Sequence, residues 1–196
     1  MKTCKSTLAV DSLPSAPGNS FLFHRAFMAM ALGNFFVGSS FNSFAIFPLF
    51  VGEHGGNRVD VGILMGAVMF SSVACRPWIS SMIDRMGRKR GFAIGALIMS
   101  VLPLVYLLFR GDLSSFFWLL LPVRLLHGIG LALCITAAFT YAGDIIPEGR
   151  LNEGIGIFGI SGLIGMALGP VIGELVSVHL GFSAFFLVAA GLGTVG

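Results

Sequence analysis

The chain of 196 residues is 56% hydrophobic and only 11% charged, and its net charge is +3. Soluble globular domains carry roughly 25% charged residues, so this chain has too few charged side chains to cover a soluble surface. Apolar residues dominate throughout, which excludes an intrinsically disordered chain. The small basic excess, without a soluble basic face, excludes a nucleic-acid-binding protein and is typical of cytoplasmic loops in membrane proteins. The composition therefore predicts that the lipid bilayer surrounds this chain.

A polar segment, residues 1–20, precedes six apolar stretches. Because Asp11 and Pro14 lie where a signal peptide would be apolar, we expect a cytoplasmic N-terminal tail. The stretches cover residues 26–51, 61–83, 92–109, 116–143, 155–178 and 183–196, and the last is short enough that we expect it to be truncated. Open strands cannot cross lipid and barrel-type alternation is absent, so the stretches are helices. The predicted fold class is an all-α membrane protein with six transmembrane helices over residues 21–196.

Lysines and arginines are unequally divided between the two ends of these helices. Only Arg58 and Arg110 fall in the loops on one side. The other side, which includes the N-terminus, holds Lys2, Lys5, Arg25, Arg85, Arg88, Lys89, Arg90 and Arg150. Because cytoplasmic loops carry the excess of positive charge, we expect a multi-pass protein of the cell membrane with a cytoplasmic N-terminus.

The loop between the second and third stretches, residues 80–91, is the most informative segment. Its cations fit a cytoplasmic loop, but Asp84 is unfavourable at a helix C-terminus and Gly87 indicates a tight turn with positive φ. The segment resembles the signature G-x-x-x-D-R-x-G-R-[KR] of the major facilitator superfamily, with Ser80 in place of the first glycine. The resemblance implies that this chain matches the N-terminal six-helix half of a carrier, built from two inverted three-helix repeats.

The resemblance also implies a charged gate at the cytoplasmic end of the bundle. In this family the loop acid and its basic neighbours hold the cytoplasmic helix ends together, and the cluster breaks and re-forms as the two halves move. The residues expected in this cytoplasmic gate are Asp84, Arg85, Gly87, Arg88, Lys89, Asp144 and Arg150.

Arg124 lies well inside the fourth stretch, and His127 follows three residues later on the same helix face. A cation near the bilayer centre costs about 2.5–3.5 kcal/mol, so a functional role is the first hypothesis and a purely structural pairing is the alternative. The segment is similar to the family's helix-4 motif R-x-x-x-G-x-G, which is associated with proton or substrate handling. We expect both residues to line a substrate and proton cavity with Asn34 and Asn42, although hydrogen bonding to neighbouring helices would also explain the two asparagines.

A stripe of glycines runs along the fifth stretch, at Gly159, Gly162, Gly165, Gly169 and Gly173. Such a stripe lets helix backbones approach closely, and a proline within a span removes a backbone hydrogen bond. The segment resembles the family's helix-5 motif G-x-x-x-G-P-x-x-G-G, typical of its export branch, with Glu174 in place of the last glycine. The resemblance implies a helix-5 hinge at Gly165, Gly169, Pro170 and Gly173.

Other function classes have weaker support. Ser161 lies in a G-x-S-G segment like that of rhomboid-type intramembrane proteases, but the only later histidine, His179, would lie about 27 Å away along a continuous helix. We therefore expect no enzyme activity. Histidines and cysteines fall in separate segments without metal-ligand spacing, so no metal or cofactor is expected. A half-size or truncated membrane subunit or scaffold that does not transport alone remains the main alternative.

These observations together predict a secondary active transporter of small organic solutes that works by alternating access. The export-type motif favours proton-coupled efflux over import. The expected partners are the lipid bilayer, a small-molecule substrate, protons as the coupling ion, and the missing C-terminal half or a second copy of the chain.

Overall fold

The structure, a computed structural model, describes residues 24–196, so the tail expected over residues 1–20 lies outside the described residues. Every regular element in the described part of the chain is helical, which confirms the all-α class. The elements are α1 (Arg25–Ser43), η1 (Phe44–Ile46), α2 (Phe47–Glu53), α3 (Arg58–Ala74), α4 (Arg76–Met86), α5 (Arg88–Val105), η2 (Tyr106–Leu108), α6 (Leu113–Ile145), η3 (Glu148–Arg150) and α7 (Leu151–Val195).

Several of these helices are long and apolar enough to cross a bilayer. Within residues 24–196, four segments meet this requirement, namely Arg25–Glu53, Arg88–Leu108, Leu113–Ile145 and Leu151–Val195. The helices α3 and α4 meet it together as a fifth, although they are bent by 52° at their junction. Pro77 lies in the first turn of α4, where its missing N–H is tolerated but would interrupt a continuous helix. The count of six helices stays a prediction.

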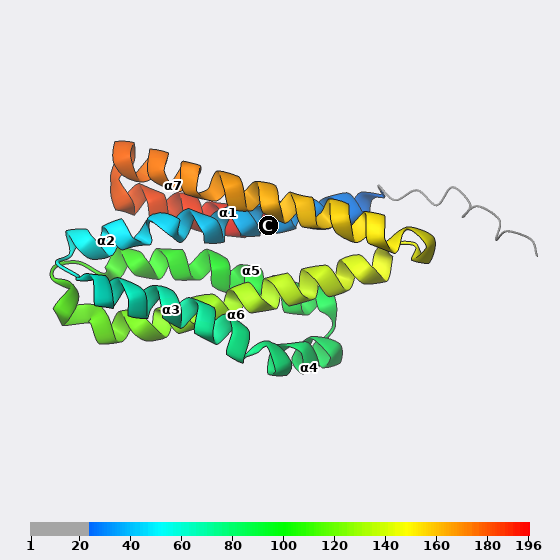
Figure 1. The fold of residues 1–196 in the computed structure, drawn as a ribbon, viewed down its shortest axis with the longest axis horizontal. Coiled ribbons are helices and arrows are strands. Elements are labelled where there is room, and N and C mark those ends of the chain that lie inside the picture. Colours follow the sequence, from blue (N-terminus) through cyan, green and yellow to red (C-terminus); the bar gives the residue numbers. More distant parts are fainter. Residues whose placement is uncertain (1–23) are drawn as a thin grey trace, which may run out of the picture.

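The chain reverses direction inside α7. At Gly181 the backbone leaves helical geometry, with φ 81° and ψ 171°, and the final segment runs back beside the first part of α7 (Figure 1). A positive φ of this size strains any residue with a Cβ, which explains the glycine at the turn. The reversal lies within the expected loop between the fifth and sixth stretches, residues 179–182.

The connections gather at two opposite ends of the bundle (Figure 1). The α4–α5 turn, the α6–α7 connection and the start of α1 lie at one end. The α2–α3 and α5–α6 connections and the turn at Gly181 lie at the other end. At that second end Asn57 caps α3: its side chain accepts hydrogen bonds from the backbone of Val59 at 2.7 Å and Asp60 at 3.0 Å. The charged gate residues predicted from sequence therefore all lie toward the first end.

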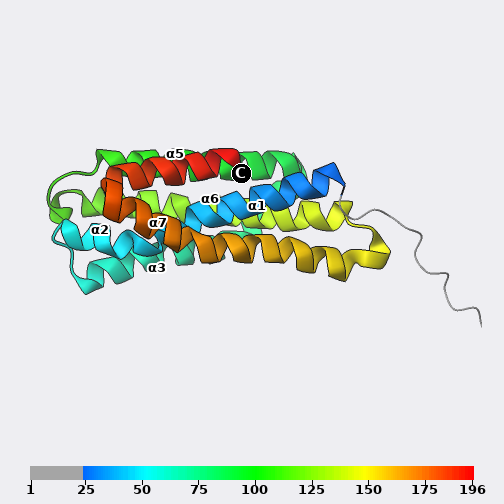
Figure 2. The same cartoon turned by 90° about the horizontal axis from the view of Figure 1, so that it is seen from above.

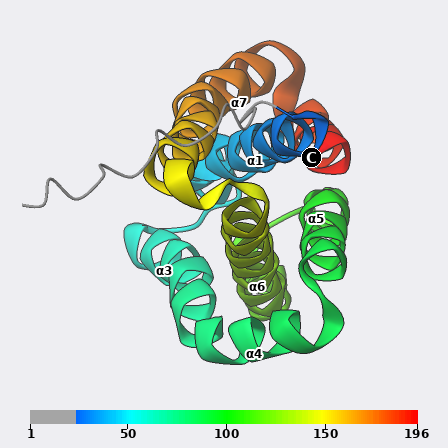
Figure 3. The same cartoon turned by 90° about the vertical axis from the view of Figure 1, so that its right-hand side faces the viewer.

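The helices pack around α6 and α1. Seen along the bundle, α6 lies between α3, α4 and α5, with α1 between it and α7 (Figure 3). Seen from above, the last part of α7 runs alongside α5 (Figure 2). A Cβ on Gly193 would lie only 2.9 Å from the Met99 carbonyl oxygen, so this contact is made backbone to backbone.

The glycine stripe packs α7 against α1. A Cβ on Gly169 would lie 2.7 Å from the Ser39 carbonyl oxygen, and one on Gly173 would lie 2.6 Å from that of Ser43. Glycine is thus required for this approach, as in other small-residue helix contacts in membranes. Gly159 does not belong to the contact, because its Cβ would meet open space, so the packed stripe is shorter than the sequence pattern.

Candidate functional site

Arg124 lies on α6 in the middle of the bundle and is only 1% exposed. Its guanidinium carbon lies 3.3 Å from the ring centroid of Phe47, 5.3 Å from that of Phe44 and 5.4 Å from that of Tyr106. These rings come from η1, α2 and η2, elements that pack onto α6 from two sides. The charge of Arg124 is therefore enclosed by aromatic side chains, which we call the aromatic cage.

The aromatic cage stabilises the charge of Arg124, but it offers no strong hydrogen-bond acceptor to the N–H groups of the guanidinium. The Nη2 atom lies 3.8 Å from the Met65 sulfur, and Nε is buried without a hydrogen-bond partner in the described part of the chain. A desolvated cation over a ring gains about 2 kcal/mol, comparable with the cost of about 2.5–3.5 kcal/mol for a cation in the bilayer centre. Rings accept no strong hydrogen bond, and each unmet buried donor costs about 1–3 kcal/mol. The site thus holds a cation whose capacity to donate hydrogen bonds is not used up.

His127 lies next to the aromatic cage and is fully buried. Its Nδ1 atom lies 3.4 Å from the Tyr106 hydroxyl, and its Nε2 atom has no hydrogen-bond partner among the described residues. Phe44 meets the imidazole edge-on, with ring centroids 4.7 Å apart. The i,i+3 spacing predicted that Arg124 and His127 share a face of the helix, and the structure brings both to the same aromatic residues.

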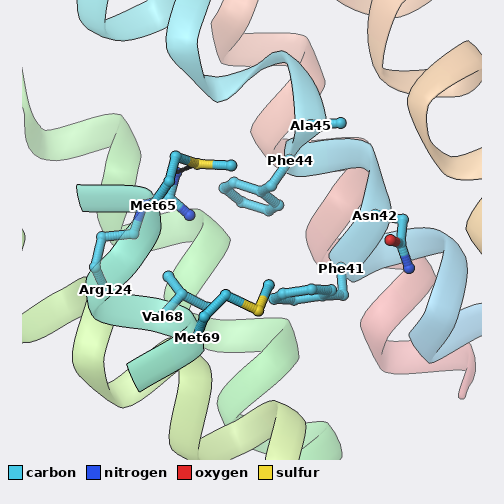
Figure 4. A pocket seen from close by; sticks show the side chains of 8 residues that line it. All are labelled: Phe41, Asn42, Phe44, Ala45, Met65, Val68, Met69 and Arg124. Carbon is cyan, nitrogen blue, oxygen red and sulfur yellow. Dashed lines mark hydrogen bonds between the residues drawn. The ribbon is translucent and has the colours of Figure 1, made fainter. Parts of the chain in front are cut away.

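A cavity of about 130 Å³ opens beside Arg124. Its walls come from α1, η1, α3 and α6, and are formed by Phe41, Asn42, Phe44, Ala45, Met65, Val68, Met69 and Arg124 (Figure 4). Most of these side chains are apolar. Asn42 lies on the far side of this group from Arg124, and its amide donates to the Gly38 carbonyl oxygen in its own helix at 2.8 Å.

Asn34 lies away from this cavity, at the contact between α1 and α7. Its amide donates to the carbonyl oxygen of Phe158 at 3.3 Å and to the hydroxyl of Ser161 at 3.1 Å. Of the predicted cavity residues, Arg124 and Asn42 therefore line this cavity. His127 lies beside the aromatic cage, and Asn34 lies elsewhere.

The predicted cytoplasmic gate surrounds the turn between α4 and α5. Gly87 has φ 91° and ψ 146°, which confirms the expected positive φ. This turn places the Nε atom of Arg88 2.6 Å from a carboxylate oxygen of Asp144 on α6. The amine of Lys89 lies 5.7 Å from the ring centroid of Tyr141, also on α6. Two of the predicted gate cations thus contact the C-terminal end of α6.

The other predicted gate residues are arranged differently. Asp84 and Arg85 are exposed at the end of α4, and Asp84 forms no ion pair with another described residue. Arg150 donates from Nε and Nη2 to the carboxylate of Glu153, at 2.8 and 2.6 Å. These hydrogen bonds raise the pKa of Arg150 above its usual value.

The hinge residues of α7 lie in continuous helix. The structure keeps helical geometry through Pro170, and the break comes later, at Gly181. Gly165, Gly169 and Gly173 are buried against α1. Their role as a hinge therefore stays a prediction, next to their observed role in packing.

Sequence reasoning missed Tyr106 and Glu153. Tyr106 is fully buried between Arg124 and His127, and Glu153 holds Arg150. A signal for Tyr106 exists in the composition, since the chain has 19 phenylalanines but only two tyrosines, so a phenolic hydroxyl inside an apolar stretch is unusual.

The features needed for protease or metal chemistry do not come together. Ser161 donates its hydroxyl hydrogen to the Phe158 carbonyl oxygen at 2.6 Å. His179 lies on the same helix, which is unbroken between them, so about 27 Å of helix rise separates the two. In residues 24–196 no group of three histidine, cysteine, aspartate or glutamate side chains could hold a metal ion.

Comparison with known proteins gives the family. The profile of the Major Facilitator Superfamily matches residues 27–196. The chain is 25% identical over 185 residues to Multidrug resistance protein MdtG of Escherichia fergusonii, covering 91% of this chain and 44% of that protein. It is 26% identical over 139 residues to a probable sphingolipid transporter, spinster homolog 1, of Arabidopsis thaliana, covering 71% of this chain and 27% of that protein. It is 27% identical over 125 residues to a staphylopine export protein of Staphylococcus aureus, covering 64% of this chain and 30% of that protein.

The matched regions cover less than half the length of each of these relatives. The apolar helices of the structure agree with a multi-pass membrane protein. The family match includes every helix from α1 to α7, and only the first two residues of α1 lie outside it. The chain therefore belongs to the Major Facilitator Superfamily.

Proposed function

We propose that this chain forms the N-terminal half of a plasma-membrane carrier that exports small organic compounds by alternating access, coupled to protons. The names of two relatives, a multidrug resistance protein and an export protein, support the direction of transport. The excess of cations at the end of the bundle that includes the α4–α5 turn supports a cytoplasmic N-terminus.

The observation that carries the proposal is the ion pair between Arg88 and Asp144. Their side chains are 35% and 48% exposed, so the pair lies at the edge of the bundle, within reach of water. An exposed pair is worth about 0.2–1 kcal/mol, which is small enough to break and re-form in each transport cycle. Asp84, exposed at the same turn, is then available to residues of the second half. We assign this cluster the role of a latch that is closed when the cytoplasmic side is closed.

The aromatic cage and its cavity are the proposed substrate side of the same half. In this family's architecture the substrate path lies between two halves, near the bilayer midplane. The second half is supplied by further chain or by a second copy. No acidic side chain described within the helices pairs with Arg124, so the carboxylate that exchanges protons comes from elsewhere in the complete carrier.

Proton release from everted membrane vesicles tests the proposal. Vesicles holding the full-length protein are acidified inside, and ethidium, 4-phenylbutyrate and 4-phenylbutanol are added in turn while the internal pH is followed. Proton-coupled export predicts that at least one compound enters and collapses the gradient only in vesicles that contain the protein. Failure of a broader compound panel to do so, or uptake only into vesicles of opposite orientation, would contradict export.

Two matched acid substitutions locate the effect. Asp144→Asn removes the carboxylate of the latch and is expected to slow gradient collapse. Asp112→Asn changes an exposed acid at the opposite end of the bundle, whose side chain caps nothing, and is expected to behave as wild type. Equal rates in the two variants would contradict the role of the latch.

A further inference from the structure

Two buried polar atoms on one face of α6 have no hydrogen-bond partner among residues 24–196. They are Nε of Arg124 and Nε2 of His127, and both residues are at most 1% exposed. A neutral imidazole that accepts a hydrogen bond from the Tyr106 hydroxyl at Nδ1 carries its hydrogen at Nε2. Both atoms are then donors, and buried donors are almost always paired in folded proteins. Nε of Arg124 is a donor whichever tautomer His127 adopts, so the described residues leave at least this donor without an acceptor.

The described acidic side chains supply no negative charge here either. Most described acidic side chains lie at or near helix ends: they are Glu53, Asp60, Asp84, Asp112, Asp144 and Glu153. The other one, Glu174, lies inside α7 and is exposed. Asp60 accepts from the Asn57 backbone, and Asp144 and Glu153 pair with other arginines. No acidic side chain among residues 24–196 pairs with Arg124. The three rings around the guanidinium lower the cost of its burial but bring no counter-charge.

The cavity beside Arg124 has room for a small charged group and apolar walls for what is attached to it. Its volume of about 130 Å³ equals the share of roughly four water molecules in the liquid. Met65, Val68 and Met69 line it from α3, and Phe41 lines it from α1. Methionine adapts to irregular apolar shapes, so these walls suit an apolar tail or ring rather than a polar solute.

We infer that this cavity binds the carboxylate of an amphiphilic organic anion, with Arg124 as its charge partner and the methionine-rich walls around its apolar part. The guanidinium fork matches two carboxylate oxygens, and such charge-assisted hydrogen bonds are the strong ones. The same fixed positive charge opposes a cation. The inference rests on the proposed transport function only in naming its substrate class, because the binding itself needs no ion gradient.

Three probes of one shape and different charge test this directly. The full-length protein is held in lipid nanodiscs at neutral pH, and the binding of 4-phenylbutyrate, 4-phenylbutanol and 4-phenylbutylamine is measured by calorimetry. We expect the anion to bind at least about tenfold more tightly than the alcohol and the amine, given the strength of charge-assisted hydrogen bonds. Equal binding of the three probes, or a preference for the amine, would overturn the inference even before any variant is made.

Substitutions then assign the preference to one side chain. Arg124→Met is expected to lose the preference for the anion while keeping the binding of 4-phenylbutanol, and Arg124→Lys keeps a weaker preference. Arg76→Met makes the same chemical change at an exposed position at the start of α4 and is expected to match wild type. A preference that persists in Arg124→Met would overturn the inference. Anion binding without gradient-driven movement in vesicles would contradict the proposed transport and leave the binding site standing, so the two failures are distinguishable.

Discussion

Arg88 and Arg124 lie on neighbouring helices, α5 and α6, and their charges are held in opposite ways. Arg88 is one-third exposed and has a carboxylate 2.6 Å away. Arg124 is buried and has ring faces around it, the nearest centroid 3.3 Å away, but no described acid. An ion pair near water separates at little cost because water solvates both charges. A buried cation without an acidic partner, in contrast, is stabilised when an anion binds to it. The charge of Arg88 therefore suits a contact that breaks and re-forms, and the charge of Arg124 suits the binding of a ligand.

The largest effect is expected from Arg124→Met. Removing the guanidinium deletes charge-assisted hydrogen bonds worth about 1.5–3 kcal/mol, so transport of an anionic substrate should fall about 10- to 150-fold. The folded protein should be no less stable, because an apolar side chain of similar length replaces a buried charge. Initial uptake rates and thermal unfolding in nanodiscs measure the two quantities. A large loss of stability with unchanged transport would break the contrast with Arg88.

Gly169→Ala is expected to lower the free energy of unfolding, unlike the two arginine sites, whose expected effects are on transport. Its Cβ would lie 2.7 Å from the Ser39 carbonyl oxygen, so α1 and α7 must separate, at a cost of about 1–3 kcal/mol. Gly159→Ala, on the same helix but facing open space, should change the free energy of unfolding by less than about 0.5 kcal/mol. Reversible unfolding in mixed micelles compares the two variants. Equal stabilities would show that α1 and α7 are not in backbone contact.

Asp144→Asn tests the exposed charge pair. Loss of an interaction worth about 0.2–1 kcal/mol should lower the transport rate by at most about fivefold and leave the free energy of unfolding nearly unchanged. Exchanging the charges, with Arg88→Asp and Asp144→Arg together, should restore most of the rate. A double variant slower than both single variants would show that the two side chains do not act as a pair.

The smallest effect is expected from Lys89→Gln. The amine lies 5.7 Å from the Tyr141 ring, and an exposed cation–π contact is worth about 0.5 kcal/mol, so the transport rate should change about twofold. Lys89→Arg preserves the charge and the contact and should match wild type. A tenfold loss in Lys89→Gln would place this lysine in the same role as Arg124.

The sequence was sufficient to predict features that depend on local spacing. The helical class follows from long apolar stretches, the positive φ of Gly87 follows from a charged loop with one glycine, and the shared face of Arg124 and His127 follows from the 3.6-residue period. Each of these depends on residues that are close in the chain. Local sequence spacing is therefore enough to predict these features, because none of them depends on how the helices pack.

Features that depend on contacts between distant elements could not be predicted. The aromatic cage joins Phe47 to Tyr106, which belong to different helices, and no period relates them. Asn34 faces α7 instead of the cavity because the rotation of α1 is set by its close contact with the glycine stripe. The bend at Pro77 divides a stretch whose hydropathy is continuous. These features depend on how the helices pack against one another, and hydropathy along the sequence does not predict that packing.

Steady-state uptake into proteoliposomes, with the two arginine sites varied side by side, tests the central claim most directly. The division of roles predicts that Arg124→Met raises the KM for a transported anion at least about tenfold, because ground-state binding is lost. It predicts that Asp144→Asn lowers the maximal rate and leaves KM unchanged, because only a conformational step is affected. A rise in KM for Asp144→Asn, or an unchanged KM for Arg124→Met, would contradict the assignment of one charge to movement and the other to the ligand.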